Sequence, residues 1–371
     1  MLNSKTALIH LVTSTAILST VAWLQGNGQA AVAAPTASAG YNVSLFAPNP
    51  TGTSGTDSIA IDGNYVYVGY GDGTKSNGSD GLPSTVAQFT TSGQLLQTFS
   101  VPGHNDGLRI DPTTGQVYAL LNQDGNSKLT TIDPATGTQE TYTLPAVNGG
   151  GGYDDLTFLN GKLFIDPSSP TLNNGVNQTP VLATLSLSGG QATITPVLSS
   201  DNGLTAVNSA TGQTVPFNLT DTDSLGVTPS GALTIDGEND KALFTVTNPG
   251  TTQQQVSVLP HPSFTADDNV SGPTTPSSLL VATSSGVYQI SGPFVPGATY
   301  ISSSSDRAVG TLDPSGTLTP IVSGLASSSG LGFLPSSSTQ SVPEPDSALG
   351  TLAFGALGIC FMLRGQLKQQ K

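Results

Sequence analysis

The chain has 371 residues, with 24 acidic and 10 basic side chains and a net charge of −14. A body this acidic repels phosphate backbones, which excludes nucleic acid as a partner. The chain has 44 Gly, 26 Pro, 21 Asp and 3 Glu, and a single cysteine that leaves no pair for a disulfide. Because Asp, Gly and Pro favour turns and disfavour helix interiors, this composition predicts short strands joined by tight turns.

The N-terminal residues have the order of a secretory signal. Lys5 is the only charged residue before Asp57, and an apolar run follows it over residues 7–24. Small residues come next, at 31–33 and 37–39, and both triplets fit the pattern that a signal peptidase accepts. We expect residues 1–39 to be a signal peptide cleaved after Ala39. Cleavage after Ala33 and a retained membrane helix are the alternatives.

The body, residues 40–335, reads as a repeated β unit. Between Asp57 and Val101, four short alternating segments are separated by Gly- and Asn-rich turns, a count that fits one propeller blade. Comparable units open at Leu108, Leu156 and Leu225. A more diverged fifth unit opens at Asp267-Asp268, and its later strands are expected at 279–282 and 287–290. Residues 331–334 resemble one more opening strand.

Each opening strand follows an acid, and these acids are 49, 48, 69 and 45 residues apart. The long interval predicts an insertion at about 201–220. The body therefore resembles β-propellers of the NHL or lactonase-like groups, which implies an all-β fold. We expect six blades, with five or seven as alternatives and a β-sandwich as the competing architecture.

The opening acids are the candidate site. The first strand of each propeller blade lines the central channel, so these carboxylates are expected to converge at one mouth. Hard oxygen ligands favour Ca²⁺, which makes calcium the candidate cofactor. The alternative is that each acid caps its own turn or hydrogen-bonds a neighbouring backbone N–H. The candidate ligands are Asp57, Asp106, Asp154, Asp155, Asp223 and Asp268.

Catalytic signatures are few in the body. It has no Gly-x-Ser-x-Gly sequence, and its only histidines are His104 and His261. His104 lies beside the opening acid Asp106 and is the stronger candidate for a catalytic histidine. The sequence therefore names no catalytic residue.

The C-terminal residues have three parts in a fixed order. A linker at 336–347 contains Val342-Pro343-Glu344-Pro345, residues 348–363 are uncharged and mostly apolar, and residues 364–371 are basic. This order resembles the PEP-CTERM sorting signal. The resemblance implies that an exosortase-type enzyme recognises residues 342–345. We expect 348–363 to be a transmembrane helix, with the basic tail in the cytoplasm and the body outside. A plain membrane anchor is the alternative.

These features together predict an exported cell-surface propeller that is processed by signal peptidase and an exosortase. We expect it to act as a binding or extracellular-matrix component, with extracellular polysaccharide as a partner, rather than as an enzyme. The alternative is a calcium-dependent propeller hydrolase such as a lactonase.

Overall fold

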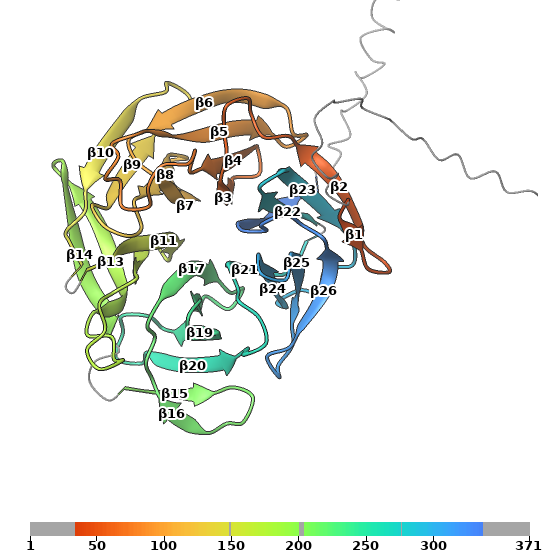
Figure 1. Cartoon of the computed structure of the whole chain (residues 1–371). Helices are drawn as coiled ribbons and strands as arrows, with labels where there is room; N and C mark the ends of the chain where they lie inside the picture. The colour runs from red at the N-terminus through yellow and green to blue at the C-terminus, as the bar shows by residue number, and fades with distance from the viewer. Residues whose placement is uncertain (1–33, 148–149, 200–203, 276, 337–371) are drawn as a thin grey trace, which may run out of the picture. The chain divides into compact units, whose positions relative to one another are not determined.

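Six β-sheets surround a central channel in the computed structural model (Figure 1). The structure describes residues 34–147, 150–199, 204–275 and 277–336. The innermost strands of the sheets contact one another in ring order, β3, β7, β11, β17, β21 and β27, and β27 contacts β3 again. The protein is thus an all-β, six-bladed propeller, as the sequence predicts. The expected signal peptide and C-terminal helix lie outside the described residues, apart from 34–39.

The first three blades each use four strands in chain order. Their strands are β3 (Thr56–Ile61), β4 (Tyr65–Tyr70), β5 (Ser84–Thr90) and β6 (Leu95–Val101); β7 (Asn105–Ile110), β8 (Val117–Leu121), β9 (Lys128–Ile132) and β10 (Gln139–Thr143); and β11 (Gly152–Leu159), β12 (Lys162–Ser168), β13 (Pro180–Ser188) and β14 (Gln191–Ser199). Every neighbouring pair is antiparallel. Each inner strand therefore starts at one end of the channel, and the β3–β4-type turns lie at the other end.

The fourth blade carries the insertion expected from the long spacing of the acids. Its four strands are β17 (Thr222–Val227), β18 (Leu233–Gly237), β19 (Ala242–Thr247) and β20 (Gln255–Pro260). A hairpin of β15 (Thr205–Asn208) and β16 (Thr214–Pro216) adds to its outer edge, where β15 runs parallel to β20. The insertion thus widens one blade to six strands and leaves the channel unchanged.

The fifth and sixth blades are interlaced. The fifth contains β21 (Asp268–Ser271), β24 (Thr299–Ser303), β25 (Ala308–Leu312), β26 (Leu318–Ser323) and β1 (Thr36–Ala37). The sixth contains β27 (Leu331–Pro335), β22 (Ser277–Thr283), β23 (Gly286–Ser291) and β2 (Asn42–Ala47). After β21 the chain crosses to build two strands of the sixth blade, and then returns to finish the fifth.

The assignment of 279–282 and 287–290 to the fifth unit was therefore wrong, because these residues are the middle strands of the sixth blade. The packing gives the reason. Leu280 and Ala282 pack against the first blade, whereas Leu279 and Val281 pack against the fifth. A strand that is apolar on both faces needs a blade on each side, and the sixth position supplies both. Residues 331–334 do form an opening strand, that of the sixth blade.

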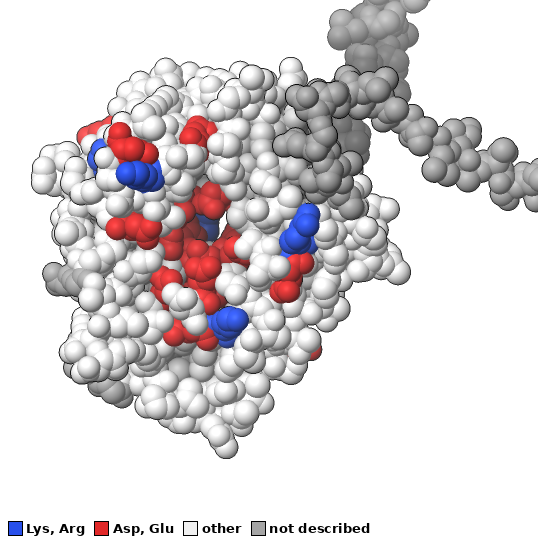
Figure 2. Space-filling view, viewed as in Figure 1, with Lys and Arg blue, Asp and Glu red and all other residues white. Residues whose placement is uncertain are grey.

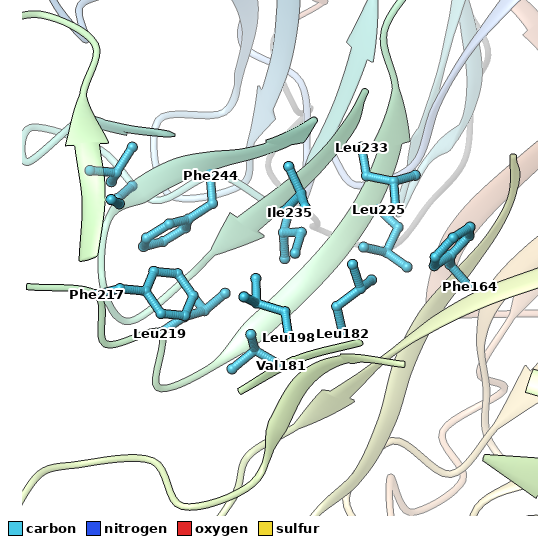
Figure 3. Close-up of a cluster of buried hydrophobic side chains, with 14 of the residues drawn as sticks. Phe164, Val181, Leu182, Leu198, Phe217, Leu219, Leu225, Leu233, Ile235 and Phe244 are labelled. Atoms are coloured by element: carbon cyan, nitrogen blue, oxygen red, sulfur yellow. The ribbon is translucent and has the colours of Figure 1, made fainter. Parts of the chain in front are cut away.

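The core lies between neighbouring blades. In β4, Val66 and Val68 pack toward the sixth blade and Tyr67 packs toward the second, as the two-residue period of a strand requires. Figure 3 shows the cluster between the third and fourth blades, where Phe217 packs edge-on against Phe244 with ring centroids 5.3 Å apart. Apolar side chains on both sheet faces thus fix the positions of the inner strands.

Candidate functional site

A cavity of about 80 Å³ opens at the end of the channel where the inner strands begin. All six acids expected from the sequence line it, together with Asp267 and Arg109. Figure 2 shows acidic side chains gathered around a hollow at the centre of this face. The opening acids therefore converge at one end of the channel, as the sequence predicts.

The same backbone irregularity lies at the acids of four inner strands. In β3, β7, β11 and β17 the pairing with the next strand skips a residue at the acid. In β3, for example, Thr56 pairs with Tyr70 but Ile59 pairs with Val68. Such a β-bulge bends the strand and re-aims a side chain. The bulges fall at Asp57-Ser58, Asp106-Gly107, Asp154-Asp155 and Asp223-Ser224.

The acids that line the cavity form two groups, which we call the outer and the inner layer. The outer layer has one acid from each of five blades, namely the first acid at each opening strand. Ser329 has the corresponding place in the sixth blade. Its acids are Asp57, Asp106, Asp154, Asp223 and Asp267. Asp155 and Asp268, the inner layer, each follow an outer-layer acid directly in the chain.

Three outer-layer acids are joined by side-chain hydrogen bonds. Asp106 bonds to Asp57 on one side and to Asp154 on the other. Two carboxylates cannot bond to each other, so in each pair at least one carboxyl is protonated and donates to an oxygen of the other. Protons shared between adjacent blades therefore reduce the repulsion in this part of the ring.

The pKa values of the ring acids are raised, chiefly because the surrounding groups remove the carboxyls from water. The pKa of Asp57 rises to about 8, that of Asp268 to about 7 and that of Asp267 to about 6. Burial raises the pKa values of Asp106, Asp154 and Asp223 well above their usual range. The site therefore holds both protonated and ionised carboxyls near neutral pH.

The acids of the inner layer are tied to the backbone of the next blade. Asp155 Oδ2 accepts hydrogen bonds from Arg109 Nη2 at 2.5 Å and from the Leu225 N–H at 2.9 Å. Asp268 accepts from the Leu331 N–H at 2.6 Å. Asp155 thus joins the third blade to the fourth, and Asp268 joins the fifth to the sixth. Each of these two acids therefore hydrogen-bonds a neighbouring backbone N–H, which is part of the alternative to metal binding.

Two residues of the site, Asp267 and Arg109, were not predicted from the sequence. Asp267 was seen only as the neighbour of Asp268, although Asp57, Asp106, Asp154 and Asp223 all lie two residues before a core Ile or Leu. In the fifth blade Asn269 takes the place of that Ile or Leu, and the acid two residues before it is Asp267. Arg109 had no such signal, because its role comes from bonds to the third and fourth blades.

The positions of the acids bear on metal binding. Among the described residues, no group of three or more His, Cys, Asp or Glu side chains is placed so that it could hold a metal ion. Asp155 and Asp268 instead accept hydrogen bonds from the backbone N–H groups of Leu225 and Leu331. Calcium binding by these acids therefore stays a prediction of the sequence.

Neither histidine of the body is among the residues that line the cavity. His104 Nδ1 is 2.9 Å from Thr74 Oγ1, in a loop between the first two blades. His261 is fully buried, stacks on Phe264 and lies 3.5 Å from Asp236. The chemistry of the cavity therefore depends on carboxyl groups.

No protein-family model and no curated protein matches this chain. Solved structures that resemble it include a streptogramin B lyase, at 15% identity over 76% of this chain and 87% of that chain, with a TM-score of 0.46. Others are the virginiamycin B lyase of Staphylococcus aureus (12%, 80% and 89%, TM-score 0.43) and a gluconolactonase of Xanthomonas campestris (10%, 78% and 82%, TM-score 0.44). Because these TM-scores are below 0.5, the fold assignment rests on the strand pairing of this chain alone.

Proposed function

We propose that this propeller is a hydrolase of small esters or lactones that uses the carboxyl groups of its central cavity as acid and base. The observation that carries the proposal is the spread of pKa values within one cavity. Asp57, at about 8, keeps its proton at pH 7, whereas Asp267, at about 6, is ionised. Carboxyls whose pKa values are driven apart can divide the roles of acid and base.

The chemistry that these two groups supply is hydrolysis by general acid–base catalysis. Asp267 accepts a proton from water as the water oxygen bonds to the carbonyl carbon. Asp57 donates its proton to the ester oxygen as the carbon–oxygen bond breaks. The products are a carboxylic acid and an alcohol, and proton exchange with solvent restores both carboxyls.

Charge limits the substrate class. The cavity is lined by seven acids, with Arg109 as the one basic residue among the described lining residues. Loops on the same face add further acids, namely Asp72, Asp80, Asp124, Asp221, Glu238, Asp240 and Asp306. An anionic substrate would be repelled from this face. The proposed substrate is therefore neutral or cationic.

The test is turnover of a panel of neutral lactones and aryl esters by the purified protein. We expect a bell-shaped pH profile with limbs near 6 and 8, and a loss of kcat of at least tenfold in Asp57→Asn and Asp267→Asn. Asp111→Asn is the matched control, since Asp111 lies in an exposed turn at the opposite end of the channel. The rate should be the same in EDTA. A rate that needs added Ca²⁺ would replace the carboxyl mechanism with the metal-dependent one.

A second proposal concerns location and is favoured by the C-terminal sequence. The motif at 342–345, the apolar run at 348–363 and the basic tail support export, exosortase processing and a body outside the membrane. These residues lie outside the described part of the chain. Within that part, no helix is long and apolar enough to cross a membrane.

The location also supports the second candidate function, a binding component among extracellular polysaccharides. The two candidates differ in one measurement. Retention of the purified protein on polysaccharide, without turnover of any panel member, would favour the binding component.

A further inference from the structure

The described chain begins with a strap, residues 34–47, that completes two blades. Its β1 pairs with β26 at the outer edge of the fifth blade, with Thr36 opposite Ser323 and Ala37 opposite Val322. Its β2 then pairs with β23 at the outer edge of the sixth. The strap is therefore the part of the chain that bridges the outer edges of the interlaced blades.

Residues between the two strands are also built into the fold. The Ser38 N–H donates to the Ile321 carbonyl at 2.8 Å, and Ser38 Oγ donates to the Pro320 carbonyl at 2.8 Å. The Tyr41 N–H donates to the Ser38 carbonyl at 3.0 Å, which closes the turn that leads to β2. The backbone through Ser38 thus continues the edge of the fifth blade.

Tyr41 anchors the strap at the junction of the two blades. Its ring packs edge-on against Phe294, with centroids 5.7 Å apart, and its side chain joins the apolar cluster of the fifth and sixth blades. A Cβ at Gly292 would lie 2.2 Å from the Tyr41 ring, so only glycine leaves room for it. Ala37 packs against the same cluster.

We propose that signal peptidase cleaves between Ala33 and Ala34, so that the mature protein begins with the strap. Water adds across this peptide bond: its hydroxyl joins the Ala33 carbonyl carbon, and the Ala34 nitrogen takes up a proton as the new terminal amine. Ala31-Val32-Ala33 supplies the small-x-small sequence that the reaction needs.

The site expected from the sequence, after Ala39, fits the same sequence rule but lies inside the strap. Cleavage there removes β1 and Ser38 from the fifth blade, and with them the pairing to β26 and the packing of Ala37. It also leaves Tyr41 as the second residue, without the Ser38 carbonyl that its N–H bonds. Cleavage after Ala33 retains the β1 pairing, the Ser38 hydrogen bonds and the packing of Ala37.

The test is the N-terminal mass of full-length protein exported by a bacterial host. We expect Ala34 as the first residue. Ala33→Tyr should abolish cleavage, because a large residue replaces the small one before the cut bond. Ala39→Tyr is the matched control and should leave the Ala34 terminus unchanged, since Ala39 is exposed. A Gly40 terminus, an intact Met1 terminus, or loss of cleavage in Ala39→Tyr alone would overturn the proposal.

A second measurement tests the strap directly. Proteins that begin at Ala34 and at Gly40 are compared by thermal unfolding. The shorter protein should have a midpoint lower by about 2 °C or more, since it lacks the β1 pairing and the Ala37 contacts. Equal midpoints would show that β1 contributes nothing to the blade and would remove the reason to prefer Ala33.

Discussion

Arg109 of the second blade donates to Asp155 of the third blade at 2.5 Å and, through the same nitrogen, to the Leu225 carbonyl of the fourth at 2.9 Å. Asp155 in turn accepts from the Leu225 N–H. One ion pair therefore connects three consecutive blades beside the acid ring. Its positive charge also lowers the pKa of Asp155 and of Asp268 against the effect of burial.

Arg109→Met should destabilise the protein. The substitution leaves the Asp155 carboxylate buried without its cation, and removal of one partner from a buried pair costs about 3–5 kcal/mol. Denaturant unfolding at pH 7 measures the loss, with Lys162→Met as the control, because Lys162 is exposed. A loss no larger than that of the control would mean that solvent or protonation neutralises Asp155.

Stability should fall as the pH rises through the neutral range. The pKa of Asp57 is 3.8 in a model peptide and about 8 in the folded protein, so between these values the folded state holds a proton that the unfolded state has released. The contribution is fully present below about pH 4 and is lost as the pH passes 8. Asp267 and Asp268 also stabilise the folded state at low pH, and their contributions are lost as the pH passes their pKa values of about 6 and about 7.

Denaturant unfolding between pH 4.5 and 9 measures this dependence. Asp57→Asn should flatten the curve between pH 5 and 8 by about 1.4 kcal/mol per pH unit, the value for one proton. Greater stability at pH 8 than at pH 5 would contradict the raised pKa values.

Gly330→Ala should disturb the junction of the sixth and first blades. The Gly330 N–H donates to the Asp57 carbonyl at 2.6 Å, and a Cβ at this position would lie 2.4 Å from that oxygen. Such overpacking typically costs about 1–3 kcal/mol, and here it also displaces the backbone of Asp57.

The control for this substitution is Gly161→Ala, in an open turn where the new Cβ contacts nothing but φ is +74°. Thermal unfolding compares stability, and the acid limb and base limb of the turnover profile report on Asp57. If Gly330→Ala unfolds at the temperature of Gly161→Ala and keeps the wild-type profile, the junction is not rigid.

Changing Pro343 and Glu344 to Ala should block processing of the tail without weakening membrane insertion. The apolar run 348–363 and Arg364 are untouched, so the energy of insertion barely changes. Prolines keep a segment extended and outside a helix, as a protease substrate must be. Unprocessed, membrane-held precursor should accumulate in the native host, as shown by its size and fractionation. Identical processing of both forms would identify the motif as a linker.

The repeat in the sequence was sufficient to predict the ring and its acids. Strand alternation and the spacing of Asp57, Asp106 and Asp154 are local patterns, and each blade repeats them. Consecutive apolar residues such as Leu279 and Leu280 also show that a strand is apolar on both faces. This pattern does not say which blades pack against the two faces, because any apolar surface can cover them.

The division of the acids into two layers depends on three-dimensional context as well. Asp154 and Asp155 are adjacent in the sequence, yet one bonds to Asp106 and the other to the backbone of Leu225. The bulge separates them, and a bulge is visible only once both strands are paired. The bonds of Arg109 to the third and fourth blades likewise have no sequence signature.

The interlaced blades have a consequence for synthesis. Thr36 pairs with Ser323, and Asn42 pairs with Ser291. The strands β1 and β2 are therefore synthesised early but can pair only after the C-terminal part of the propeller has been made. The hairpin of β22 and β23 is made before β27, the strand that connects it to the channel. Contacts between such distant residues form late, and unpaired strand edges promote aggregation until they do. A nascent chain that stops before Pro335 therefore cannot close the ring, and truncated products should be removed by proteolysis or aggregate.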